Sequence, residues 1–147
     1  MKWIDLPPVW LLGFLGLAWL QATHVPVMNF YGFGRGAGTV LACLGALLMV
    51  AALPSFARAR TTVVPRKAPS ALITTGVYAL SRNPIYMADL MILVGLSLRW
   101  GSILGLILAP VFVRIITTRF ILGEETRLAD AFGADYLAYK ESVRRWF

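Results

Sequence analysis

Residues 85–122 read IYMADLMILVGLSLRWGSILGLILAPVFVRIITTRFIL, two apolar runs interrupted by the tripeptide Arg99-Trp100-Gly101. Apolar runs of this kind are typical of helices that cross a lipid bilayer. Because three residues leave room only for a tight turn at the membrane interface, the stretch predicts an antiparallel helical hairpin. Its helices would cover residues 85–98 and 102–122.

Two further apolar blocks lie nearer the N-terminus, at residues 9–20 and 37–53. The first is short for a membrane span, and a cleavable signal peptide is the alternative to a retained helix. The sequence LQAT that follows it does not form a typical small-residue cleavage site, which favours retention. The second block is expected to end at Pro54. Small residues that would allow close helix packing in lipid are Gly38, Ala42 and Ala46, and Gly101, Gly105 and Ala109.

The composition supports a bilayer environment. Of 147 residues, 59% are hydrophobic and 14% are charged, whereas a soluble domain carries about 25% charged residues. The net charge of +7 resides in Lys and Arg that flank apolar blocks, so it indicates anionic lipid headgroups and no nucleic acid partner. With one cysteine (Cys43) and one histidine (His24), neither a disulfide nor a metal site is expected. The glycine-rich segment 32–38 has no preceding strand and is expected to be a flexible turn rather than a phosphate-binding loop.

The basic residues predict an orientation. In a four-span arrangement nearly all of them fall on one side, and only Arg35 and Arg99 fall on the other. The positive-inside rule then places both termini and the loop before the hairpin in the cytoplasm. Gly123 is expected to end the fourth helix, and residues 124–139 are expected to form a polar, amphipathic helix.

The sequence therefore predicts an all-α integral membrane protein with about four transmembrane helices and a C-terminal amphipathic cytosolic helix. It would be a single membrane domain. Its parts would be residues 1–54 with the first two spans, 55–84 as a cytosolic loop, 85–122 as the hairpin and 123–147 as the C-terminal cytosolic segment.

Two motifs flank the hairpin on its cytosolic side. The loop ends in LITTGVYALSRNPIY (residues 72–86), and the sequence EETRLADAFGADYLAY (residues 124–139) follows the hairpin. In order and spacing these motifs resemble those of the isoprenylcysteine carboxyl methyltransferase and phospholipid methyltransferase superfamily of integral membrane methyltransferases. The resemblance covers about residues 69–146.

This resemblance implies an S-adenosylmethionine site at the cytosolic ends of the last spans, under a lid made by the C-terminal segment, with S-adenosylhomocysteine as product. A lipophilic small-molecule or lipid acceptor would arrive from the bilayer, and the implied location is a prokaryotic inner membrane. Arg119, one turn before the acidic pair, would orient the acceptor. The residues implied at the cofactor are Leu72, Ile73, Gly76, Tyr78, Arg82, Asn83, Pro84, Tyr86, Glu124 and Glu125.

The chemistry of the cofactor gives a physical reason for such residues. S-adenosylmethionine carries a sulfonium and an ammonium, so a site at the edge of the bilayer needs a carboxylate or aromatic faces to offset their desolvation. Glu124, Tyr78 and Tyr86 supply both. Methyl transfer is an in-line displacement, which needs alignment of the reacting atoms and, for a protonated acceptor, removal of a proton.

Some of these residues also have a structural interpretation. An acidic pair in the first turn of a helix is expected from the helix dipole alone, and Arg82 could pair with a lipid phosphate. Asp89 lies about one turn inside an apolar span, where an ionisable residue is costly. It could receive a substrate or cofactor group, or pair with Arg114 or Arg119 on the facing helix, and the pair is slightly favoured. Asp89 and Arg119 are the catalytic candidates.

Two departures from the superfamily pattern bear on the acceptor. The members that methylate prenylated proteins usually carry His where this chain has Ser70 and Asn83, which argues against that acceptor and leaves a carboxylate, an amine or a thiol open. Two other functions are alternatives. A small four-helix multidrug-type transporter would need an ionisable residue in its first span, where this chain has none. A membrane reductase of the steroid-reductase kind would bind a nicotinamide instead.

Overall fold

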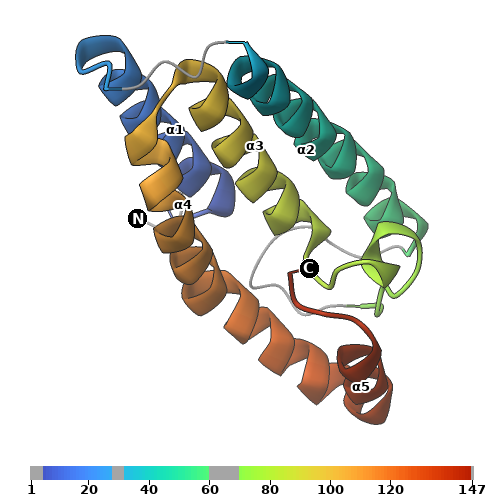
Figure 1. Ribbon diagram of the computed structural model, residues 1–147. Helices are drawn as coiled ribbons and strands as arrows, with labels where there is room; N and C mark the ends of the chain where they lie inside the picture. Colours follow the sequence, from blue (N-terminus) through green and yellow to red (C-terminus); the bar gives the residue numbers. More distant parts are fainter. Residues whose placement is uncertain (1–4, 28–31, 60–69, 147) are drawn as a thin grey trace.

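The computed structural model describes residues 5–27, 32–59 and 70–146, and within these ranges every regular element is helical (Figure 1). Part of the predicted cytosolic loop, residues 60–69, lies outside the described residues. Helices α1 to α4 form a bundle, α5 continues beyond it, and the chain then turns back towards the start of α3. The helices are α1 (Pro7–His24), α2 (Phe33–Arg58), α3 (Pro84–Trp100), α4 (Ile103–Ile116) and α5 (Leu122–Ser142).

The predicted hairpin is present as α3 and α4. Pro84 occupies the first position of α3, where its fixed φ suits a helix and its missing N–H is not needed. Gly101 ends α3 in the left-handed region with φ 74°, a conformation that glycine adopts without strain. The hydroxyl of Ser102 then accepts a hydrogen bond from the N–H of Gly105 at 3.1 Å and caps α4.

Helix α2 is longer than the sequence predicted at both ends. It begins at Phe33, so most of the glycine-rich segment 32–38 forms its first turns, and the prediction of a flexible turn is wrong. It also passes through Pro54 to Arg58. Proline removes one backbone hydrogen bond from a helix, but in an apolar environment a continuous helix still satisfies the other backbone groups.

The chain after α4 also differs from the prediction, because no helix ends at Gly123. A π-helical turn (Thr117–Ile121) leads directly into α5, which contains Gly123 in its first turn. The helical path breaks instead at Gly133, where φ is 50° and ψ is −120°. Residues 124–139 are therefore two helical segments and not one amphipathic helix. Glycine adopts a positive φ without strain, which suits Gly133 to this break.

Helices α2 and α3 pack at backbone distance. A Cβ atom on Gly38 would lie 2.5 Å from the carbonyl oxygen of Gly95, and one on Gly95 would lie 2.5 Å from the backbone nitrogen of Ala42. Gly45 makes a similar approach, at 2.9 Å from a carbonyl oxygen of α3. The predicted close packing of small residues is thus confirmed at Gly38 and Ala42. The third contact is made by Gly45 and not by Ala46, which is exposed.

The opposite side of α3 packs against α1 and α4 through an apolar core. Gly105 of α4 brings its helix close to Ala18 of α1 and Ser97 of α3, as expected for a small residue in the hairpin. Further along the bundle the rings of Phe14 and Phe112 meet edge to face, with centroids 5.5 Å apart. The buried members of this core are Phe14, Tyr86, Leu93, Ala109, Phe112, Ile116, Phe120 and Ile121.

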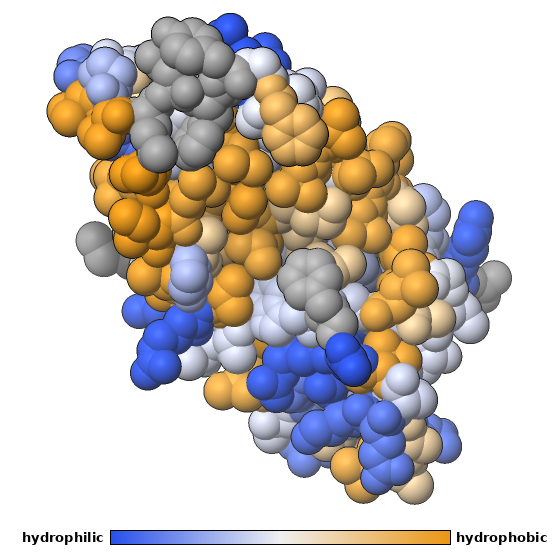
Figure 2. All heavy atoms as spheres, in the orientation of Figure 1, coloured by the Kyte–Doolittle hydropathy of each residue, from blue (hydrophilic) through white to orange (hydrophobic). Residues whose placement is uncertain are grey.

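The surface separates into an apolar and a polar part. Apolar side chains cover much of the visible face of the bundle, whereas charged side chains gather at the end that carries α5 (Figure 2). Among the described residues, two helical stretches, α2 and Ile103–Ser142, are long and apolar enough to cross a membrane. Up to Leu122 the second stretch carries only two charged residues, Arg114 and Arg119, and from Glu124 onward charged residues are frequent.

Candidate functional site

The C-terminal segment is bound to the start of α3. The backbone N–H of Arg82 donates to the carbonyl oxygen of Arg144 at 3.0 Å. The carbonyl oxygen of Arg145 accepts from the Ser81 hydroxyl at 3.2 Å and from the Asn83 amide at 3.0 Å. These bonds join residues more than sixty positions apart in the chain, and they hold the Arg-Asn-Pro motif and the C-terminus together.

Glu125 is the charged centre of this contact. Its two carboxylate oxygens accept hydrogen bonds from Nε and Nη2 of Arg145 at 2.8 and 2.7 Å, and Nη1 of Arg82 lies 3.2 Å from Oε1. The side chains of Glu125 and Arg82 are only 11% and 9% exposed. Burial by itself raises the pKa of Glu125, but the two guanidinium groups outweigh it and hold the pKa below its ordinary value. We call Glu125, Arg82 and Arg145 the arginine clamp.

One member of the arginine clamp retains an unused donor. Nη1 of Arg82 also donates to the hydroxyl of Tyr136 at 3.2 Å, but its Nε–H is buried without a hydrogen-bond partner in the part of the chain that the structure describes. A buried donor without an acceptor is unfavourable, so this nitrogen is a place where a ligand would gain a hydrogen bond.

Glu124 lies in a different environment from its neighbour. Its Oε1 accepts a hydrogen bond from the Tyr86 hydroxyl at 2.9 Å, and no cation forms a salt bridge with it among the described residues. Burial raises the pKa of the Glu124 carboxyl above its ordinary value, although Tyr86 and Arg127 oppose that effect. The site therefore holds a carboxylate that the protein has desolvated but not neutralised.

Tyr78 and Tyr139 form a further part of the site, near the Glu124 carboxylate. The Tyr139 hydroxyl donates to the carbonyl oxygen of Tyr78 at 2.6 Å, and both rings are buried. Burial raises the pKa of the Tyr139 hydroxyl to about 12, and that of Tyr78 is raised by burial and by the nearby Tyr139 and Glu124. Both phenols are thus neutral hydrogen-bonding groups with apolar ring faces.

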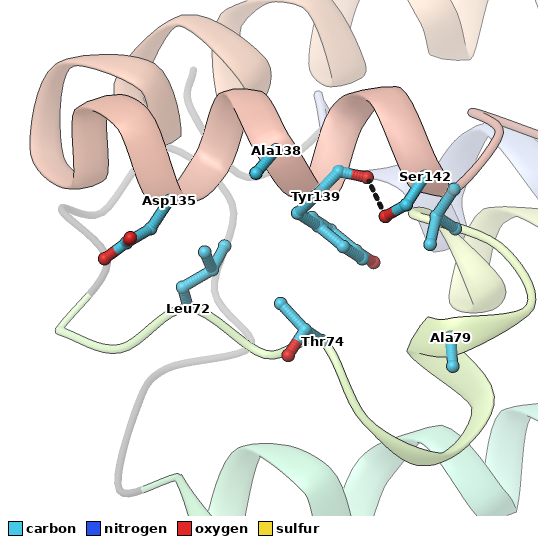
Figure 3. Close-up of a pocket in the computed structure, with 8 residues that line it drawn as sticks. Leu72, Thr74, Ala79, Asp135, Ala138, Tyr139 and Ser142 are labelled. Atoms are coloured by element: carbon cyan, nitrogen blue, oxygen red, sulfur yellow. Dashed lines mark hydrogen bonds between the residues drawn. The ribbon is translucent and has the colours of Figure 1, made fainter.

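An open pocket of about 640 Å³ lies beside Tyr139. In Figure 3 the loop residues Leu72 and Thr74 lie across it from α5. Its lining combines apolar surface with the hydroxyls of Thr74 and Ser142 and the carboxylate of Asp135. The full lining is Leu72, Thr74, Ala79, Asp135, Ala138, Tyr139, Ser142 and Val143.

The structure brings together many of the residues that the sequence singled out. Tyr86 and Glu124 are in contact, Arg82 and Glu125 are in the arginine clamp, and Leu72 lines the pocket. The others form the framework of the site. Gly76 starts a 3-10 turn (Gly76–Ala79) with φ 65°, Asn83 binds the C-terminal segment, Pro84 begins α3, and Ile73 is half-buried in the loop.

The two catalytic candidates have different surroundings from those expected. Nη1 of Arg119 binds Asp5 at 2.9 Å, and its guanidinium lies over the ring of Trp10, so it is not in contact with the acidic pair. Asp89 is buried in α3, and it forms no ion pair with Arg114 or Arg119. The expected structural pair is wrong, because Arg114 is exposed and Asp5 already holds Arg119.

Sequence reasoning missed Arg145, Ser81 and the pocket residues of α5. Arg145 stands at the end of a basic segment that the positive-inside rule already explained, so nothing in its own position distinguished it. The signal that could have identified Arg145 is the second acidic residue, Glu125. If only one carboxylate of the acidic pair binds the ligand, the other needs a cation from the protein. Tyr136 and Tyr139 belong to the second motif, and both are buried in the site.

Comparison with known proteins places this chain in a family. A sequence profile described as phospholipid methyltransferase matches residues 34–135, which is more than half of the chain. The chain belongs to the phospholipid methyltransferase family. An uncharacterized protein of Haemophilus influenzae is 37% identical over 62 residues, which cover 42% of this chain and 98% of that protein. No solved structure matches the chain.

The family match confirms the expected superfamily and favours neither the transporter nor the reductase. Together with the two stretches long enough to cross a bilayer, it identifies a membrane protein of a methyltransferase family. The region matched contains the loop motif, the hairpin and both members of the acidic pair.

Proposed function

We propose that this protein transfers a methyl group from S-adenosylmethionine to a lipophilic acceptor at the cytosolic face of a membrane. The observation that carries the proposal is the half-buried Glu124 carboxylate, held by Tyr86 and without a salt bridge among the described residues, in a chain of the phospholipid methyltransferase family. A partly desolvated anion of this kind complements a cationic ligand.

The residues present fit the amino-acid end of S-adenosylmethionine. That end has a carboxylate, for which the unused Nε–H of Arg82 is a buried donor, and an ammonium, for which Glu124 is a half-buried acceptor. The aromatic faces of Tyr78 and Tyr86 would lie beside the sulfonium. When bound, the cofactor supplies a methyl group attached to a positively charged sulfur, while these residues bind and orient it and exclude water.

The adenosine end would occupy the open pocket. Leu72 and the ring of Tyr139 offer apolar and aromatic surface for a base, and the hydroxyls of Thr74 and Ser142 offer partners for a ribose. The arginine clamp closes the site from the C-terminal side, because it binds residues 144 and 145 to the start of α3. Its role would be to fix Arg82 for the cofactor.

The arrangement in the membrane is part of the same proposal. Helices α1 to α4 would be four spans of one membrane domain in a prokaryotic inner membrane, with both termini in the cytoplasm. The distribution of basic residues and the gathering of charged side chains at the α5 end support it. This orientation brings the site to the compartment where soluble cofactors occur.

Calorimetric titration with S-adenosylhomocysteine tests the proposal on the protein purified in lipid nanodiscs. We expect the wild type to bind and Glu124→Gln to bind about tenfold or more weakly, which corresponds to a loss of about 1.4 kcal/mol. Glu141→Gln is the matched control, because Glu141 is an exposed carboxylate on the same helix. Absence of binding by the wild type, or equal affinity of Glu124→Gln and Glu141→Gln, would contradict the proposed site.

A further inference from the structure

Among the described residues, Asp135 is the one charged side chain in the lining of the open pocket. It belongs to the last part of α5, and Ala138, Tyr139 and Ser142 of the same helix line the pocket with it. Residues three or four apart lie on the same face of a helix, so these four side chains form one wall. The loop before α3 forms the opposite wall through Leu72.

The break at Gly133 gives Asp135 its place in this wall. Gly133 has φ 50° and ψ −120°, so α5 is kinked there. Asp130 lies before the kink and is not a lining residue, whereas Asp135 lies after it and lines the pocket. Both carboxylates are exposed residues of one helix. Their position relative to the pocket therefore distinguishes them, and their exposure does not.

The fold does not use the Asp135 carboxylate. It forms no hydrogen bond and no ion pair with any residue in the described ranges 5–27, 32–59 and 70–146. An ionised carboxylate can only accept hydrogen bonds. A ligand in the pocket would therefore have to present a donor to Asp135.

Figure 3 shows the order of the side chains along the pocket. In this view Asp135 and Leu72 lie at one end, Ala79 and Ser142 lie at the other, and Tyr139 lies between them. An elongated ligand in the pocket would thus have one end beside Asp135 and its middle beside the ring of Tyr139.

The end of the pocket at Ala79 and Ser142 adjoins the arginine clamp. Arg82 follows Ala79 by three residues, and Arg145 follows Ser142 by three residues. Under the proposed function, Arg82 binds the carboxylate of S-adenosylmethionine. The amino-acid end of the cofactor then faces this side, and the base at its other end extends towards Asp135.

We infer that Asp135 determines the base specificity of the site, by accepting a hydrogen bond from the 6-amino group of adenine. This role rests on the proposed function. Adenine carries a donor at position 6, whereas guanine and hypoxanthine carry an oxygen there that only accepts. A carboxylate attracts the amino group and repels the oxygen. Leu72 and Tyr139 provide apolar and aromatic contact for any purine, so the carboxylate is what distinguishes one purine from another.

Two ligands that differ only at position 6 test this role. We would titrate wild type in nanodiscs with S-adenosylhomocysteine and with its purine analogue, in which hydrogen replaces the 6-amino group. We expect the amino ligand to bind about tenfold more tightly, at the low end for a hydrogen bond to a charged group because Asp135 is exposed. Equal affinities, or a preference for the purine analogue, would overturn the inference without any variant.

The variant Asp135→Ala assigns the preference to this side chain. It should bind the two ligands with equal affinity, whereas the matched control Asp130→Ala should keep the wild-type preference. Both variants replace an exposed residue of α5, where substitutions change stability little. If Asp135→Ala weakened both ligands but kept the preference, another residue would bind the amino group and the inference would be wrong.

The variant Asp135→Asn tests the direction of the hydrogen bond. An asparagine amide can donate as well as accept. S-inosylhomocysteine, which has an oxygen at position 6, should therefore bind Asp135→Asn about fivefold or more tightly than it binds wild type, while S-adenosylhomocysteine changes less. Asp130→Asn should match wild type for both ligands. A merely structural role of Asp135 would shift both affinities together, so an unchanged ratio in Asp135→Asn would contradict the inference.

The outcomes separate this inference from the proposed function. If wild type does not bind S-adenosylhomocysteine, the proposed function falls and the role of Asp135 falls with it. If wild type binds S-adenosylhomocysteine and its purine analogue equally, only the role of Asp135 falls, because the contacts proposed for Glu124 and Arg82 do not involve the base.

Discussion

Both ends of the helical bundle contain clusters of polar side chains that are buried or half-buried. The two clusters differ in their charge and in how completely their hydrogen-bonding groups are paired. One end of the bundle carries the turn between α3 and α4. There the side-chain oxygen of Gln21 accepts hydrogen bonds from the Ser102 hydroxyl at 2.8 Å and from the N–H of Leu104 at 3.2 Å. The Ser97 hydroxyl donates to the carbonyl oxygen of Leu93 at 2.6 Å. These groups are neutral, and each has a partner within the chain. We call this set the turn-end cluster.

The α5 end has the opposite character, because its polar groups are charged and only some are paired. Glu125 is matched by two guanidinium groups, whereas Glu124 has only Tyr86, Asp89 has no partner among the described residues, and Arg82 keeps an unused Nε–H. Neutral clusters in which every group is hydrogen-bonded stabilise a fold, whereas buried charges without a partner are stabilised when a ligand binds to them. Under the proposed function, one end holds the helices together and the other binds the cofactor.

Breaking the arginine clamp should have the largest effect. Glu125→Ala leaves Arg82 buried without its anion, and the loss of one partner of a buried pair costs about 3–5 kcal/mol. We expect a lower thermal unfolding midpoint and weaker binding of S-adenosylhomocysteine, because the C-terminal segment and Arg82 lose their attachment. Circular dichroism on heating and calorimetric titration would measure the two effects.

Glu141→Ala is the control for this experiment, since it removes an exposed carboxylate from the same helix and should change the midpoint little. A midpoint for Glu125→Ala equal to that of the control would show that the arginine clamp does not hold the C-terminal segment. It would also remove the main distinction between the two ends of the molecule.

The sequence predicted the hairpin well because local signals decide it. Pro84 starts α3, Gly101 ends it with a positive φ, and the apolar runs on both sides have no competing structure. The same local rules failed at Pro54 and Gly123. Both residues were interpreted as helix ends, but the helix continues at both. At Pro54 the apolar environment favours the remaining backbone hydrogen bonds of the helix. At Gly123 a glycine inside a helix costs only about 1 kcal/mol, which the neighbouring turns outweigh.

The sequence predicted which residues belong to the site better than it predicted which of them bind to each other. The sequence identified Tyr86 and the acidic pair, yet it could not show that Glu124 binds Tyr86 while Glu125 binds Arg82 and Arg145. Adjacent helix residues point about 100° apart, so which carboxylate faces which partner depends on the rotation of α5. That rotation is set by the π-helical turn Thr117–Ile121, which has no sequence signature.

At the other end, Gln21→Ala should destabilise the protein without affecting the site. It removes the acceptor of the Ser102 O–H and of the Leu104 N–H and leaves these two donors without it, at a cost of about 1–3 kcal/mol. We expect a lower unfolding midpoint and an unchanged affinity for S-adenosylhomocysteine. Thr23→Ala is a suitable control, since Thr23 is exposed and bonds only locally. An affinity loss in Gln21→Ala as large as that in Glu124→Gln would mean that the two ends are coupled.

Acid should weaken the arginine clamp while leaving the turn-end cluster intact. The folded state lowers the pKa of Glu125 below the ordinary value of 4.5, so its stabilisation is present above that pH and is lost as the pH falls through the folded value. Glu124 has a raised pKa, so its contribution has the opposite sign: it favours the folded state most at low pH and is lost as the pH rises through the raised value.

Unfolding midpoints measured from about pH 7 to about pH 3 would separate these carboxylates, since each variant removes one titration. The stability difference between wild type and Glu125→Gln should shrink on acidification by on the order of 1 kcal/mol, because protonation turns charge-assisted hydrogen bonds into neutral ones. Glu124→Gln should gain stability relative to wild type as the pH rises, and Gln21→Ala should differ from wild type by the same amount at every pH. A pH-independent difference for Glu125→Gln would contradict the arginine clamp as an ion pair, because a neutral contact would not titrate.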